Sequence, residues 1–176
     1  MRRLWAATAV TLLLAAPAAW GAALPDAFYG RWIGSGLAEG IDTRALELSP
    51  RDLDVSIEPD DDGFRVQWTT VIREAASPAA NTRERAASLT FQPTDRPGVF
   101  SAKESGNPQD GGVLSWARLA GDTLSVFQMA MTDRGGFAFT AYARTLTDTG
   151  MALEFSRFTD GVPERRATGR LVRMER

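Results

Sequence analysis

The sequence predicts an all-β protein, an antiparallel up-and-down β-barrel of about 8–10 strands. Two observations lead to this prediction. Apolar and polar residues alternate along most of the chain with the period of two that is typical of a strand with one buried face. Turns containing Gly or Asp interrupt this alternation at short, regular intervals. Strands that follow one another in this way favour a barrel, because closure removes the exposed edges of a sheet.

The segment before the predicted barrel has the composition of a secretory signal peptide. Arg2 and Arg3 form a basic start, residues 4–19 are largely apolar, and small residues follow up to Ala23. The apolar run is shorter than the roughly 20 residues that a membrane span needs. We therefore expect cleavage after Gly21 or Ala23, so that residues 1–23 are removed and residues 24–176 form one domain. The mature chain would have no integral membrane span and would be periplasmic or secreted in a bacterium.

The clearest predicted strands form a hairpin early in this domain. Residues 53–58 and 64–73 alternate on either side of the acidic turn 59–63. Trp68 then shares one face with Phe64, and this face is expected to be buried. The simplest interpretation of Trp68 is a core residue, and it contacts a ligand only if side chains do not fill the barrel.

The remaining strands follow the same pattern and are joined mainly by short turns. Three longer connections, residues 39–52, 74–85 and 104–112, are expected to be loops at the rim of the barrel. The other predicted strands span residues 31–37, 87–91, 99–103, 114–119, 123–132, 137–146, 151–158 and 165–173.

The composition excludes several kinds of functional site. The sequence contains no Cys and no His, which excludes disulfides, thiol nucleophiles, ordinary zinc sites, Ser-His-Asp triads and His-ligated haem. The acidic turn at residues 60–62 lacks the spacing of a calcium-binding EF-hand. No metal and no cofactor are therefore expected. Removal of Arg2 and Arg3 would leave 18 basic and 22 acidic side chains, a net charge of −4, which argues against nucleic acid as a partner.

The start of the first strand resembles the calycin superfamily, to which lipocalins belong. Gly30, Arg31 and Trp32 form the Gly-x-Trp motif, and a meander of antiparallel strands follows it. The chain also resembles small exported bacterial lipocalin-like domains of unassigned function. This resemblance implies that Trp32 closes one end of the barrel and that an arginine of the last strand packs across it. Arg173 is the expected partner, because it alternates onto the same face as Leu171. No disulfide is possible here, which departs from classical lipocalins.

The interior of the barrel is the expected binding site for a small hydrophobic ligand. Tyr142 and Arg144 are expected on the outer face, opposite the more apolar set of the same strand. For Arg157, an interpretation in which the side chain reaches solvent at the rim stays open. The expected walls of the site are Trp68, Phe139, Leu153 and Phe155, and Arg157 or Gln128 would orient a polar end of the ligand.

These observations favour an exported lipocalin-like protein that binds a small apolar or amphipathic ligand without a cofactor. Two other functions stay open. One is an interaction or protease-inhibitor type of β-barrel, which would act through its rim loops. The other is a cofactor-free barrel isomerase or hydratase, whose acid–base groups would be Glu154 or Tyr142. Both side chains are expected on the outer face, so binding is favoured over catalysis. No oligomeric state is predicted.

Overall fold

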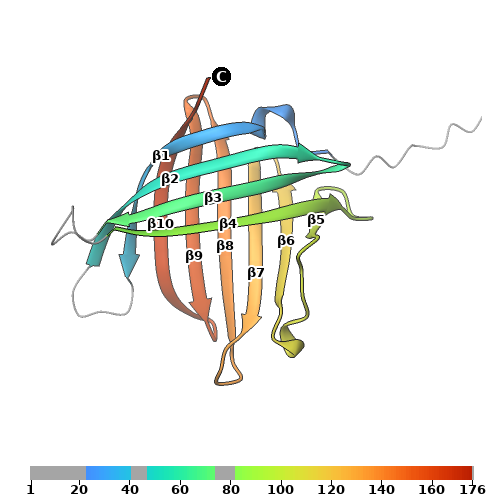
Figure 1. Ribbon diagram of the computed structural model, residues 1–176, viewed down its shortest axis with the longest axis vertical. Coiled ribbons are helices and arrows are strands. Elements are labelled where there is room, and N and C mark those ends of the chain that lie inside the picture. Colours follow the sequence, from blue (N-terminus) through green and yellow to red (C-terminus); the bar gives the residue numbers. More distant parts are fainter. Residues whose placement is uncertain (1–22, 41–46, 74–81, 176) are drawn as a thin grey trace, which may run out of the picture.

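The computed structural model describes residues 23–40, 47–73 and 82–175, so that nearly all of the predicted signal peptide lies outside the described residues. These residues form a closed barrel of ten antiparallel strands (Figure 1), which confirms the predicted fold class. No helix in the described ranges is long and apolar enough to cross a membrane. The strands are β1 (Gly30–Gly40), β2 (Glu47–Asp60), β3 (Gly63–Arg73), β4 (Thr82–Pro93), β5 (Val99–Ala102), β6 (Val113–Ala120), β7 (Thr123–Met131), β8 (Phe137–Thr147), β9 (Gly150–Thr159) and β10 (Val162–Arg173). Two short 3-10 helices are η1 (Asp26–Phe28) and η2 (Pro108–Asp110).

Each strand pairs with the next one in the sequence, and β1 closes the barrel by pairing with β10. That closing pair runs from Trp32 opposite Arg173 to Gly40 opposite Arg165. Figure 1 shows β2, β3 and β4 crossing in front of β6 to β10 at a steep angle. The single sheet thus folds over itself, and its inner face encloses the core.

Several strands are longer than the sequence predicts. The segments at residues 39–52 and 74–85 were expected to be loops, but β1 continues to Gly40, β2 begins at Glu47 and β4 begins at Thr82. The exposed first half of β4 explains this error, because residues 82–88 contact solvent and carry charges on both faces. Apolar alternation is therefore absent there, although the backbone is paired with β3.

The acidic turn between β2 and β3 is held by basic side chains. Lys103 donates to Asp60 and Asp61 at 3.0 Å each, and Arg65 also pairs with Asp60. Asp61 has a φ of 50°, a left-handed conformation that Asp tolerates better than most residues. These contacts make the turn a structural corner of the barrel.

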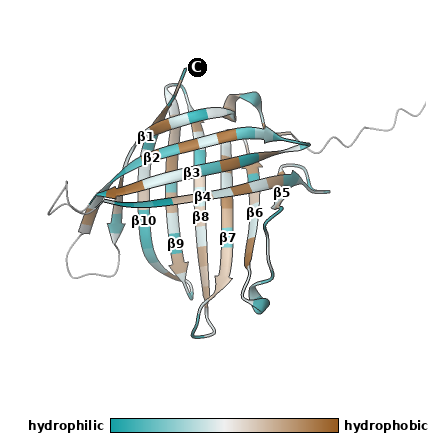
Figure 2. Ribbon diagram, in the orientation of Figure 1, coloured by the Kyte–Doolittle hydropathy of each residue, from teal (hydrophilic) through white to brown (hydrophobic). Residues whose placement is uncertain are grey.

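Large apolar side chains fill one half of the barrel. Phe64 stacks on Phe91 with ring centroids 5.1 Å apart and meets the edge of Phe100 at 4.9 Å. Apolar and polar bands alternate along β2 and β3, as Figure 2 shows. We call this region the closed half. The largest fully buried apolar side chains of the barrel are Phe28, Val55, Ile57, Phe64, Val66, Phe91, Phe100, Leu124, Val126, Met151 and Leu171.

Trp32 and η1 close the end of this half. The indole Nε1 of Trp32 donates to the carbonyl oxygen of Phe28 at 3.0 Å, and both residues are buried. The guanidinium carbon of Arg173 lies 5.5 Å from the centroid of the Trp32 ring, and the same side chain donates to the carbonyl of Tyr29. The structure thus brings together the two residues that the calycin resemblance pairs.

We predict that Arg173→Ala lowers the thermal midpoint of unfolding by about 4 °C. The variant loses a cation–π contact and a hydrogen bond, together about 1–2 kcal/mol, and each kcal/mol corresponds to about 2–4 °C in a domain of this size. Differential scanning calorimetry of both proteins measures the shift. Arg170→Ala, an exposed position on the same strand, is the matched control. Equal midpoints for the two variants would show that the Arg173 contacts do not stabilise the closed end.

Candidate functional site

The other half of the barrel contains a cavity of about 520 Å³. This volume lies within the range of about 300–1,000 Å³ that is typical of small-molecule sites. The cavity lies among β1 to β4 and β8 to β10, at the end opposite Trp32. We call this region the open half. The lining residues are Ala38, Arg51, Leu53, Val55, Trp68, Thr69, Thr70, Ile72, Glu84, Arg85, Ala86, Ala87, Tyr142, Arg144, Leu153, Phe155, Arg165 and Ala167.

Small residues at inward-facing positions keep this half hollow. Ala38, Ala87 and Ala167 line the cavity on three different strands. Gly169 continues the inward face of β10, and a Cβ atom there would lie 2.4 Å from a methyl group of Leu53. The sheet curves around these positions without side chains that reach the centre, so the sequence itself leaves room inside the barrel.

An aromatic wall lines one side of the cavity. Tyr142 lies between Trp68 and Phe155, with ring centroids 5.1 Å and 5.0 Å away. These three residues come from β3, β8 and β9. Burial raises the pKa of the Tyr142 phenol, so the hydroxyl is neutral and the wall carries no negative charge at neutral pH.

A buried arginine packs against this wall. Arg144 is fully buried, and its guanidinium carbon is 5.4 Å from the Trp68 ring centroid and 5.6 Å from that of Tyr142. None of its three nitrogens has a hydrogen-bond partner among the described residues. Burial lowers the pKa of Arg144 to about 10, which still leaves the side chain charged at neutral pH. A charge buried without an anion costs folding free energy, and the two aromatic faces offset only part of that cost.

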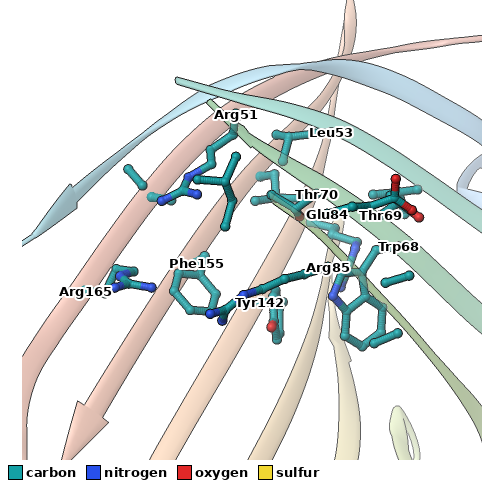
Figure 3. A pocket seen from close by; sticks show the side chains of 18 residues that line it. Arg51, Leu53, Trp68, Thr69, Thr70, Glu84, Arg85, Tyr142, Phe155 and Arg165 are labelled. Carbon is teal, nitrogen blue, oxygen red and sulfur yellow. The ribbon is translucent and has the colours of Figure 1, made fainter. Parts of the chain in front are cut away.

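Three more arginines surround the mouth of the cavity. Arg51, Arg85 and Arg165 come from β2, β4 and β10, and Figure 3 shows their guanidinium groups gathered around Phe155. We call these residues the rim arginines. Arg51 is only 9% exposed, and its Nη1 has no partner among the described residues. Burial lowers the pKa of Arg51, as does repulsion from Arg165 and Arg85.

The lining of the cavity therefore carries more positive than negative charge. Glu84 is the one carboxylate among its lining residues, and it alternates with Arg85 along β4. Its side chain thus lies on the outer face of the sheet. Four arginines line a cavity in a chain whose net charge is −2, and low-dielectric walls concentrate such a field.

Three of the expected ligand-binding residues meet in this cavity. Trp68, Leu153 and Phe155 all line it. Phe139 does not, because it lies on the outer face of β8 and packs on Phe127 at 5.9 Å and on Trp116 at 6.0 Å. Its expected place in the cavity wall is therefore not found.

The two polar residues expected to orient a ligand also lie outside the lining. The side chain of Arg157 is 47% exposed and pairs with Glu164 at 3.2 Å, which is the rim position that the sequence left open. Gln128 is half-buried, and its Nε2 donates to Ser115 Oγ at 3.5 Å. The rim arginines occupy the place that was expected for these two side chains.

The expectation that Tyr142 and Arg144 face outward is wrong. The other face of β8, which includes Phe139, is the more apolar one. The prediction therefore placed that face inside on its apolar content alone. The pairing of Arg144 with Leu153 shows the actual phase of the strand. A change of phase by one residue exchanges the two faces of a strand, and only pairing between distant strands reveals it.

The sequence did not predict Arg51 and Arg85 as site residues, because both lie in segments that were expected to be loops. The sequence could have predicted that Arg165 faces inward, because it alternates onto the same face as Ala167 and Leu171.

Comparisons with known proteins support the fold alone. No family model matches the chain, and no curated protein matches it. A protein of unknown function from the DUF3598 family of Nostoc punctiforme has a similar structure, with a TM-score of 0.54 and 15% identity over 92% of this chain. The present chain spans about half of that structure, 53% of its length. Rv2717c from M. tuberculosis matches with a TM-score of 0.49 and 11% identity over 85% of this chain and 94% of its own. The S-type phycobiliprotein lyase CPES from Guillardia theta matches with a TM-score of 0.38 and 10% identity over 85% of this chain and 89% of its own.

We predict that Arg144→Met raises the thermal midpoint by about 3 °C. Replacing a buried, unpaired charge with an apolar side chain of similar length gains about 1–4 kcal/mol, which exceeds the cation–π contacts that are lost. Scanning calorimetry without ligand measures this change. Arg144→Lys serves as the control, because it keeps the charge and loses the planar group, and its midpoint should fall. A lower midpoint for Arg144→Met would mean that the guanidinium stabilises the fold through its aromatic contacts.

Proposed function

We propose that this protein is an exported binding protein that holds one small amphipathic molecule in the open half of its barrel. One observation carries this proposal. The closed half is packed with large side chains, whereas the open half has a 520 Å³ cavity with an aromatic wall. Native protein interiors are close-packed, so a cavity of this size at the mouth of a closed barrel indicates a place for a ligand.

The cavity walls indicate how such a molecule would be held. Trp68, Tyr142 and Phe155 offer flat apolar surfaces, and Leu53 and Leu153 add aliphatic contacts. Burying a ligand's apolar surface against them contributes roughly 25 cal/mol per Å² before the entropic cost of binding. The ligand needs no metal and no reaction with the protein.

We predict that the uncharged fluorophore N-phenyl-1-naphthylamine binds the protein and that Ala167→Phe prevents this binding. The new ring would project into the cavity from the inward face of β10. Titration of the probe, followed by its fluorescence and by quenching of the tryptophan fluorescence of the protein, measures the dissociation constant, which we expect to rise at least about tenfold. Thr168→Phe places the same ring on the outer face of β10 and is the matched control. Equal affinities for the two variants, or no binding by the unmodified protein, would refute a ligand site in this cavity.

Export is the other part of the proposal, and it depends on residues 1–23. We predict that the full chain, expressed in a Gram-negative host, is recovered from the periplasm and begins at Ala22 or Leu24. Intact-mass measurement of the periplasmic fraction identifies the cleavage site. Leu13→Arg interrupts the apolar run and should leave the uncleaved chain in the cytoplasm. A chain that keeps Met1 in the cytoplasm without this substitution would contradict export.

A further inference from the structure

We infer that the natural ligand is an amphipathic acid whose oxyanion is bound by the rim arginines while its apolar body points inward to the aromatic wall. This inference rests on the proposed function and specifies the chemical class of the ligand. A carboxylate, a sulfonate or a phosphate ester supplies the oxyanion. The inference follows from three features of the open half, the rim arginines, the aromatic wall and the position of Arg144.

The first feature is the convergence of like charges from strands far apart in the sequence. Arg51, Arg85 and Arg165 lie on β2, β4 and β10, and the pKa of Arg51 is lowered by its burial and by repulsion from Arg165 and Arg85. Elsewhere on the barrel, some arginines have carboxylate partners on adjacent strands, such as Arg31 with Asp54 and Arg73 with Asp52. The rim arginines have no such partner among the described residues. An anion bound among them would relieve this repulsion.

The second feature is the partial burial of this cluster. Arg51 is 91% buried, with Nη1 shielded from water and without a partner in the described ranges. A buried donor without an acceptor is costly, and an ionised acceptor offsets that cost better than a neutral one. The planar fork of a guanidinium also matches the two oxygens of a carboxylate or a phosphate.

The third feature sets the orientation of the ligand. Arg144 is also unpartnered among the described residues and lines the cavity, but its guanidinium is fully buried against the rings of Trp68 and Tyr142, whereas the rim arginines gather at the mouth. The apolar part of the ligand therefore fits the inner end and the acid fits the mouth. The charge of Arg144 acts through space, and it adds to the positive potential of the cavity without contacting the oxyanion.

Two probes that differ in one acidic group test this inference. The fluorophore 8-anilino-1-naphthalenesulfonate is N-phenyl-1-naphthylamine with an added sulfonate. We expect the sulfonate to bind the full chain more tightly than the uncharged probe. The triple variant Arg51→Gln, Arg85→Gln, Arg165→Gln should bind the sulfonate about tenfold more weakly or worse, and this loss should exceed any change in its affinity for the uncharged probe by at least about fivefold. Raising the salt concentration should weaken only the sulfonate complex, because exposed charges are screened.

A second triple variant controls for net charge. Arg118→Gln, Arg166→Gln and Arg170→Gln remove three charges from the outer face and should leave both affinities unchanged. Ala167→Phe should prevent binding of both probes, which separates the cavity from the outer aromatic surface around Trp116. The inference of an acidic ligand would be overturned if the two triple variants lost equal affinity for the sulfonate. It would also be overturned if the unmodified protein bound the two probes with equal affinity. If the uncharged probe still binds in a way that Ala167→Phe blocks, that result overturns only this inference, and the binding function stands.

Displacement of the uncharged probe then distinguishes the possible sources of the oxyanion. Dodecanoate and dodecyl phosphate should both displace it at lower concentration than dodecanol, and the stronger of the two identifies the headgroup. Displacement by dodecanol at the same concentration as both acids would contradict recognition of an anion.

Discussion

The pairing of β1 with β10 is the constraint on which the rest of this structure depends. It closes the sheet, removes both edges, and gives every strand one face toward the interior and one toward solvent. Every second residue of the sequence is thereby assigned to the inside. The outer ion pairs agree with that assignment, because Arg31 with Asp54 and Arg73 with Asp52 join neighbouring strands where water screens and solvates them. A shift by one residue would bury these charges and expose Val55 and Ile57, so the register is strongly specified.

Closure alone does not determine whether the interior is solid or hollow. In the closed half, inward positions carry large rings, and Phe64, Phe91 and Phe100 fill the space between the two layers. In the open half, several inward positions carry Ala, Gly or Arg, and the large rings lie along one wall. The closed half provides most of the buried apolar surface that stabilises the fold. The open half can therefore keep a cavity and several unpaired cations, features that would destabilise a barrel without such a core.

The sequence revealed the fold and three of the residues that line the cavity. Alternation placed Trp68, Leu153 and Phe155 inside because their strands carry a clearly apolar inner face. The same reasoning failed on β8, where the outer face holds Phe139 and the inner face holds Tyr142 and Arg144. The lining of this cavity is more polar than the packed core of the closed half, so apolar content misidentifies the inner face of β8. Arg51 and Arg85 were missed for a related reason, because strand ends with charges on both faces look like loops.

The distribution of charge favours anions at the mouth of the cavity, although the net charge of the chain is negative. The chain carries two more acidic than basic side chains, whereas the cavity lining includes four arginines and one outward-facing carboxylate. An anion is thus weakly repelled by the molecule as a whole and attracted at one mouth, where low-dielectric walls concentrate the field. Arg144, fully buried against Trp68 and Tyr142, strengthens that field in a region where water does not screen it. Its burial costs stability in the empty barrel. A ligand that brings a negative charge to the mouth regains part of this cost, whereas a neutral ligand of the same shape does not.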